Sequence, residues 1–173
     1  MSRHTRALGI LTLVSAMAAA LPAAHGADGV VRHHEGKFPI ASAIEVPAGA
    51  ATIYLSGMGA PVVDAKADPH SIAAYGDTQA QTRGALKRIE DTLKTLGLTM
   101  GDIVQMHIYM AQDPSLGKLD FDGMMKGYTQ FFGTAAQPDL PTRSAFGVAH
   151  LANPGWLVEI EVTAVRPPAK KAG

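Results

Sequence analysis

The 173-residue chain contains no cysteine. This absence excludes disulfide bonds, a catalytic thiolate and any metal site built on cysteine ligands. Aromatic residues make up 6% of the chain and charged residues 17%. No apolar run reaches the length of about 20 residues that a membrane-spanning helix needs. Stability must therefore come from the packing of aliphatic side chains or from assembly.

The first 26 residues have the pattern of a secretory signal peptide. Arg3 and Arg6 precede an uncharged apolar run, 7–21, and small residues follow it as far as Gly26. The remaining residues, 27–173, have the length of one domain. We therefore expect a periplasmic or secreted protein with no membrane attachment after cleavage.

The charge balance and the histidines exclude several classes of function. Without residues 1–26, 13 basic residues remain against 15 acidic ones, a balance that does not attract nucleic acid. His33 and His34 lie in a segment without periodicity, and His107 and His150 stand alone in expected strands, so no metal site is predicted. Neither a glycine-rich phosphate loop with lysine nor a nucleophile elbow occurs. We expect no cofactor and no nucleic-acid partner.

Breaks in apolar patterning divide the mature chain into three parts. Residues 27–37 contain two glycines and no apolar periodicity, which indicates a flexible lead-in. A single domain is expected over 38–166, followed by a proline-containing basic tail, 167–173.

Two helices and five strands are predicted within this domain. The first helix begins at Asp77 or Thr78, with Thr78 and Gln81 forming a capping box, and ends at Gly97. A stripe of aromatic and methionine side chains predicts a second helix over 121–132. The strands are expected at 43–46, 52–56, 103–110, 144–151 and 157–165.

This order, β-β-α-β-α-β-β, indicates an α+β fold with a mostly antiparallel sheet and two helices on one face. The strand at 103–110 is apolar on both faces, so the second face of the sheet must also be covered. No further helix is available for this purpose. We therefore expect the sheet to pack against copies of itself.

Two elements near the end of the chain hold charged candidates for a binding site. Arg143 follows the turn at Pro141 and offers a planar fork suited to bidentate binding of a carboxylate. In the last strand, Glu159 and Glu161 alternate with apolar residues, which places a carboxylate across the sheet from the arginine. The structural alternative is a solvated strand face and a surface arginine.

Several motifs together resemble the Rid family of enamine/imine deaminases, over about 38–165. They are the Pro-x-Arg-Ser sequence ending at Ser144, the Val-Glu-Ile-Glu-Val run from Val158, the pair Ser56-Gly57, the triplet Gln81-Thr82-Arg83, and the pattern from Tyr128 to Phe132. The resemblance implies a chorismate-mutase-like Rid fold and a homotrimer with a barrel-like centre. It also implies active sites in clefts between subunits.

The resemblance further implies hydrolysis of 2-imino acids to 2-keto acids and ammonia. Arg143 would hold the substrate carboxylate, and Glu159 would position a water molecule with help from the backbone carbonyl of Ala145. Ser56 and Gly57 would line the substrate, and the partner would be a small imino or keto acid.

Two positions depart from the family pattern. Many relatives have a tyrosine near 41–43, where this chain has Ala-Ser-Ala, and an asparagine where this chain has Met125. Tyr75 is a candidate for a replacement hydroxyl group. These departures favour an alternative function, a non-catalytic module that binds a small carboxylate or another partner. Some relatives are described as ribonucleases, and the charge balance argues against that function here.

Overall fold

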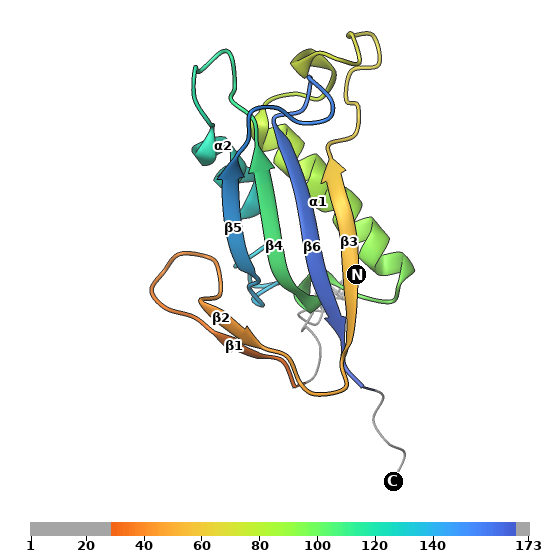
Figure 1. The fold of residues 1–173 in the computed structure, drawn as a ribbon, viewed down its shortest axis with the longest axis vertical. Coiled ribbons are helices and arrows are strands. Elements are labelled where there is room, and N and C mark those ends of the chain that lie inside the picture. Colours follow the sequence, from red (N-terminus) through yellow and green to blue (C-terminus); the bar gives the residue numbers. More distant parts are fainter. Residues whose placement is uncertain (1–28, 169–173) are drawn as a thin grey trace, which may run out of the picture.

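Four strands form the central sheet of the computed structural model, which describes residues 29–168 (Figure 1). They are β3 (Ala51–Gly59), β4 (Ile103–Met110), β5 (Thr142–Gly147) and β6 (Val158–Arg166), in the order β3-β6-β4-β5. β6 pairs antiparallel with both β3 and β4, and β4 pairs parallel with β5. The expected mostly antiparallel sheet is confirmed, with one parallel pair at its β5 edge.

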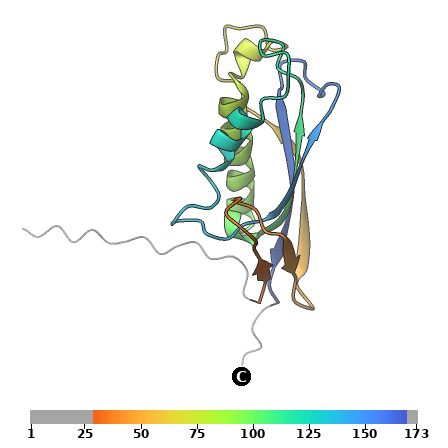
Figure 2. The ribbon, with the colours of Figure 1, turned by 90° about the vertical axis from the view of Figure 1, so that its left-hand side faces the viewer.

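Two helices, α1 (Thr78–Thr95) and α2 (Phe121–Tyr128), cover one face of this sheet (Figure 2). Between them and the sheet lies the apolar core, which includes Leu86, Ile89, Met106, Ile108 and Ile160. The α+β fold with both helices on one face is therefore confirmed. Within residues 29–168, no helix is long and apolar enough to cross a membrane. The predicted signal peptide lies outside the described residues.

The start of α1 differs in detail from the prediction. Asp77 is the N-cap residue, and its side chain accepts a hydrogen bond from the backbone N–H of Ala80. Gln81 forms no capping box. It is fully buried, and its amide donates to the carbonyl of Gly155 and accepts from the N–H of Leu157. Gln81 thus ties α1 to the connection that leads into β6.

Part of the segment expected to be a flexible lead-in, 27–37, forms a strand of a separate two-stranded hairpin. β1 (Val31–His33) pairs antiparallel with β2 (Ala43–Glu45), so β2 does not join β3 in the central sheet. Arg32 fastens the hairpin, because its guanidinium donates to the carbonyls of Gly101, Ile103 and Leu140. Burial lowers the pKa of Arg32, and the nearby Asp139 opposes that shift.

Two elements are shorter than predicted. α2 ends at Tyr128 rather than Phe132, and β5 ends at Gly147 rather than Leu151. Phe132 is still buried, with its ring stacked on Tyr128 at a centroid distance of 4.8 Å. The stripe therefore predicts the core correctly at Met124, Tyr128 and Phe132, whereas Phe121 remains exposed.

The close approach of α1 and α2 leads to a stability prediction. A Cβ atom at Gly127 would lie 2.7 Å from Thr82 Cβ and 2.9 Å from the carbonyl oxygen of Gln79. We expect Gly127→Ala to lower the free energy of unfolding by about 1 kcal/mol or more, since this overpacking outweighs the gain of about 1 kcal/mol in helix propensity. Denaturant unfolding measures the change. The neighbouring exposed Lys126→Ala is the control, and equal stability of both variants would contradict the packing argument.

Candidate functional site

Arg143 lies on β5, on the face of the sheet that the helices cover. It stands opposite the buried Met106 in the parallel pairing of β4 and β5. Its Nη1 donates to Met125 Sδ of α2 at 3.1 Å, and its Cζ lies 4.4 Å from the centroid of the Tyr128 ring. The Phe121 ring lies 5.9 Å away. α2 therefore forms one wall around the guanidinium.

The segment before β2 forms a second wall. The Phe38 ring centroid lies 5.3 Å from Arg143 Cζ. Two hydrogen bonds hold this segment in place, because Tyr128 donates its hydroxyl to the carbonyl of Pro39 and Ala41 donates its N–H to the carbonyl of Pro141. Aromatic rings from two distant segments, the one before β2 and α2, therefore lie around the Arg143 guanidinium.

The electrostatic setting of Arg143 favours binding of an anion. Burial lowers the pKa of this guanidinium, and the nearby Tyr128 opposes the shift. Burial also raises the pKa of the Tyr128 hydroxyl, which keeps it neutral. Among residues 29–168, no carboxylate forms an ion pair with Arg143. A bound carboxylate would offset part of the cost of burying this charge.

Glu159 lies on the opposite face of the sheet. Its neighbours on β6, Val158 and Ile160, point into the core, so the alternation of a strand turns Glu159 away from the helices. The pairing of β3 with β6 shifts between Leu55 and Met58, and a Cβ atom at Gly57 would overlap the Glu159 carboxylate. This irregularity, at the predicted pair Ser56-Gly57, makes room for the Glu159 side chain.

The structure does not bring the two predicted charged residues together within one chain. Arg143 faces the helices from β5, whereas Glu159 faces away from them on β6, and β4 lies between these strands. Ala145 lies two residues after Arg143 on the same edge strand. One chain therefore presents the two parts of the predicted site, here called half-sites, on opposite faces of its sheet.

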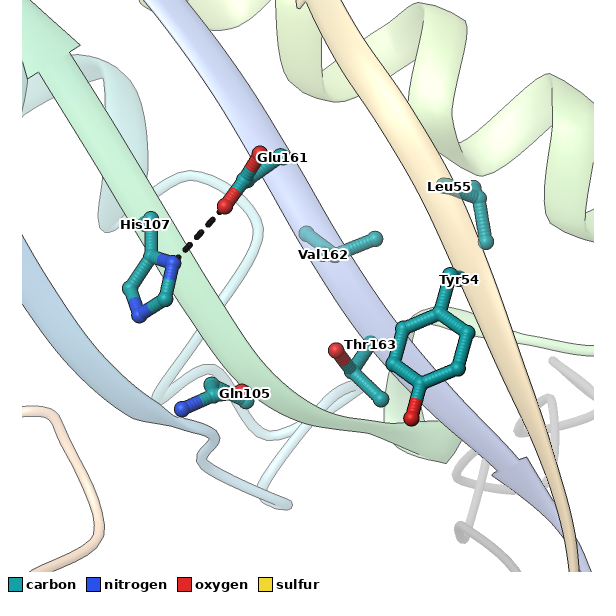
Figure 3. Close-up of a pocket in the computed structure, with 7 residues that line it drawn as sticks. All are labelled: Tyr54, Leu55, Gln105, His107, Glu161, Val162 and Thr163. Carbon is teal, nitrogen blue, oxygen red and sulfur yellow. Dashed lines mark hydrogen bonds and ion pairs between the residues drawn. The ribbon is translucent and has the colours of Figure 1, made fainter.

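A cluster that the sequence did not reveal lies on the face opposite the helices. His107 Nδ1 and Glu161 Oε1 are 2.8 Å apart (Figure 3). The Tyr109 hydroxyl donates to the same oxygen at 2.9 Å. A hollow of about 230 Å³ adjoins this pair, with Gln105, Thr163 and Tyr54 among its lining residues. The expectation that the strand at 103–110 is apolar on both faces is therefore wrong, because Gln105, His107 and Tyr109 alternate with its buried residues. This alternation shows the cluster only when the register of β4 and β6 is known.

The contribution of Glu161 to stability is expected to depend on pH. The hydrogen bond from His107, and next that from Tyr109, lowers the pKa of Glu161. A lowered carboxyl pKa contributes stability above the unfolded value of about 4.3, and that contribution disappears as the pH falls through the folded value. Because Glu161 is well exposed, we expect Glu161→Gln to cost less than about 1 kcal/mol at pH 7 and nothing near pH 3. Denaturant unfolding at both pH values measures this, with the exposed Glu35→Gln as the control; a loss that persists at pH 3 would contradict it.

Two candidates from the sequence have other roles. Tyr75 is buried, donates its hydroxyl to the carbonyl of Pro69 and accepts from the Asn153 amide, so it packs within its own loop and the adjoining one. Met125 contacts Arg143 directly. Within residues 29–168, no group of three or more histidine, aspartate or glutamate side chains is arranged to hold a metal ion.

Comparison with known proteins relates this geometry to a family. A family model described as endoribonuclease L-PSP matches residues 48–166. TdcF from Escherichia coli, solved with bound serine, is 29% identical, with 83% of this chain and 93% of that chain covered and a TM-score of 0.53. A putative translation initiation inhibitor from Vibrio vulnificus is 29% identical, with 79% and 98% covered and a TM-score of 0.53.

A third structure has the same fold. It is YyfB from Yersinia pestis, described as a member of the conserved Rid protein family, at 24% identity, with 78% of this chain and 97% of that chain covered and a TM-score of 0.58. The family model spans well over half of the chain, including both half-sites. The chain therefore belongs to the Rid family, whose model carries the description endoribonuclease L-PSP.

Proposed function

We propose that this protein hydrolyses reactive enamine and imine forms of 2-imino acids to 2-keto acids and ammonia. Water adds to the carbon of the C=N bond, a proton moves to the nitrogen, and ammonia leaves as the carbonyl forms. No metal or nucleophilic side chain is needed for these steps. The observation that carries the proposal is Arg143, a partly buried cation with no carboxylate partner among residues 29–168.

Arg143 binds the substrate carboxylate and orients the C=N bond. Its guanidinium is planar and remains charged, which suits bidentate binding of a carboxylate. The related TdcF was solved with serine, a small molecule that carries such a carboxylate. Fixing the substrate in this way converts the attack of water into a step between positioned groups.

Glu159 positions the attacking water and transfers protons, with help from the backbone carbonyl of Ala145. Because Glu159 lies on the other sheet face from Arg143, the glutamate that serves a given arginine comes from a second copy of the chain. A homotrimer, as the resemblance implies, brings the two half-sites together at each of its contacts. The predicted signal peptide supports a location of this assembly in the periplasm or outside the cell.

One observation favours the alternative, a module that binds small carboxylates without catalysis. Met125 Sδ already accepts a hydrogen bond from Arg143 Nη1, at the position where many relatives have asparagine. This contact occupies one donor of the fork and offers no polar group to a substrate. A nuclease function has less support, since the mature chain has fewer basic than acidic residues.

The proposal is tested by following keto-acid and ammonia release from imino acids that an amino-acid oxidase generates in place. A reaction without the protein gives the rate of spontaneous hydrolysis. Acceleration by the wild-type protein supports the deaminase function. Tight binding of 2-keto acids without any acceleration supports the binding module instead.

A further inference from the structure

We infer that the Arg143 site selects carboxylates with a large apolar side chain over those with a small one. This inference rests on the proposed use of Arg143 as a carboxylate anchor. It concerns the surroundings of the anchor, formed by Phe38, Phe121 and Met125.

Two phenylalanine rings provide apolar surface next to the Arg143 guanidinium. Phe38 and Phe121 lie 5.3 Å and 5.9 Å from Arg143 Cζ, and they remain 46% and 42% exposed. A carboxylate bound to the guanidinium at about 2.8 Å places its own carbon chain within a few ångström of Cζ. Both rings lie close to Cζ and keep exposed surface, so a substrate side chain bound there can contact them.

Two of the groups beside the cation, Met125 and Tyr128, offer little to a polar side chain. The contact that Arg143 makes with Met125 is to a thioether sulfur, a weak acceptor. The Tyr128 hydroxyl is already donated to the carbonyl of Pro39. A hydroxyl or amide on the substrate side chain therefore gains little at these residues, whereas an aromatic or branched aliphatic group gains buried contact.

Two hydrogen bonds hold the segment that carries Phe38 in place. Ala41 donates its N–H to the carbonyl of Pro141, two residues before the anchor, and Pro39 accepts from Tyr128. These bonds connect the segment that carries Phe38 to both α2 and the start of β5. The ring is thus preorganised beside the cation, which lowers the cost of binding against it.

The test measures kcat/KM for imino acids derived from phenylalanine, leucine and alanine, and the Kd of phenylpyruvate and pyruvate by calorimetry. We expect the large apolar compounds to be favoured by about 10-fold or more, the range for discrimination in an apolar pocket. Phe38→Ala is expected to reduce this ratio to less than about 3-fold, mainly through KM, while Phe38→Leu retains most of it. Leu116→Ala removes a side chain with a similar exposure, 49%, and is expected to leave the ratio unchanged.

The outcomes separate this inference from the proposed function. Acceleration of all three imino acids with equal kcat/KM, and equal Kd for both keto acids, would overturn the selectivity while the deaminase function stood. Preferential binding of phenylpyruvate without acceleration would overturn the deaminase function and support the selectivity. If Phe38→Ala dissociated the oligomer in light scattering and left the ratio unchanged, Phe38 would be an interface residue and the inference would be wrong.

Discussion

Replacing Arg143 with alanine is expected to lower kcat/KM for imino-acid hydrolysis by about 100-fold. Removing one partner of a buried, hydrogen-bonded charge pair costs about 2–5 kcal/mol, and each 1.36 kcal/mol changes the rate about tenfold. The affinity for 2-keto acids should fall by a similar factor, because in the proposed function Arg143 contacts the carboxylate that substrate and product share. Steady-state kinetics and calorimetry measure the two effects.

Arg143→Lys gives a sharper comparison. Lysine keeps the positive charge but loses the planar fork, so a partial loss of activity is expected. The exposed Arg83→Ala is the matched control for removal of an arginine elsewhere. If Arg143→Ala retained the wild-type rate in a folded oligomer, Arg143 would not be the anchor.

Replacing Gly57 with alanine is expected to lower the rate by about 10- to 100-fold with little change in stability. The new Cβ would lie 3.0 Å from Glu159 Cδ and 3.2 Å from its Cγ, and would overlap the carboxylate oxygen. Gly57 has no positive φ, so alanine fits the backbone and the displacement falls on the flexible Glu159 side chain. A displaced carboxylate no longer positions water, a role that contributes about 10²- to 10⁴-fold.

A double-mutant cycle identifies the cause of that loss. In a Glu159→Ala background, Gly57→Ala should reduce the rate no further, since the group that it displaces is already gone. Equal losses in both backgrounds would show that Gly57 acts on the substrate directly. A large loss of stability in the single variant would show instead that the irregular β3–β6 pairing around Gly57 cannot accommodate a methyl group.

The sequence predicted those features that depend on short-range patterns. The apolar side chains that recur at helical spacing in α1 and at every second position in β6 are buried in the core, as expected. The motif around Arg143 predicted the family, which the family model confirms. These signals are each contained within one element.

Features that depend on contacts between distant segments were not predicted. Val31–His33 has little apolar character. Its position depends on hydrogen bonds that the Arg32 guanidinium donates to three backbone carbonyls on other segments. The sequence predicts a capping box at Gln81, whereas two of the three hydrogen-bond partners of its side chain, Gly155 and Leu157, lie more than seventy residues away. Arg143 and Glu159 lie on opposite faces of the sheet. This placement depends on the order and register of the strands, which the periodicity within one strand does not determine.

In the proposed function, Arg143 and Glu159 act on one substrate from two different chains. Arg143→Ala and Glu159→Ala proteins should each be inactive alone but should recover activity when they are unfolded, mixed in equal amounts and refolded together. Random assembly gives about a quarter of the contacts an intact arginine from one chain and an intact glutamate from the next, so about a quarter of the wild-type activity is expected. No recovery, in a sample that native mass spectrometry shows to contain mixed oligomers, would contradict the account.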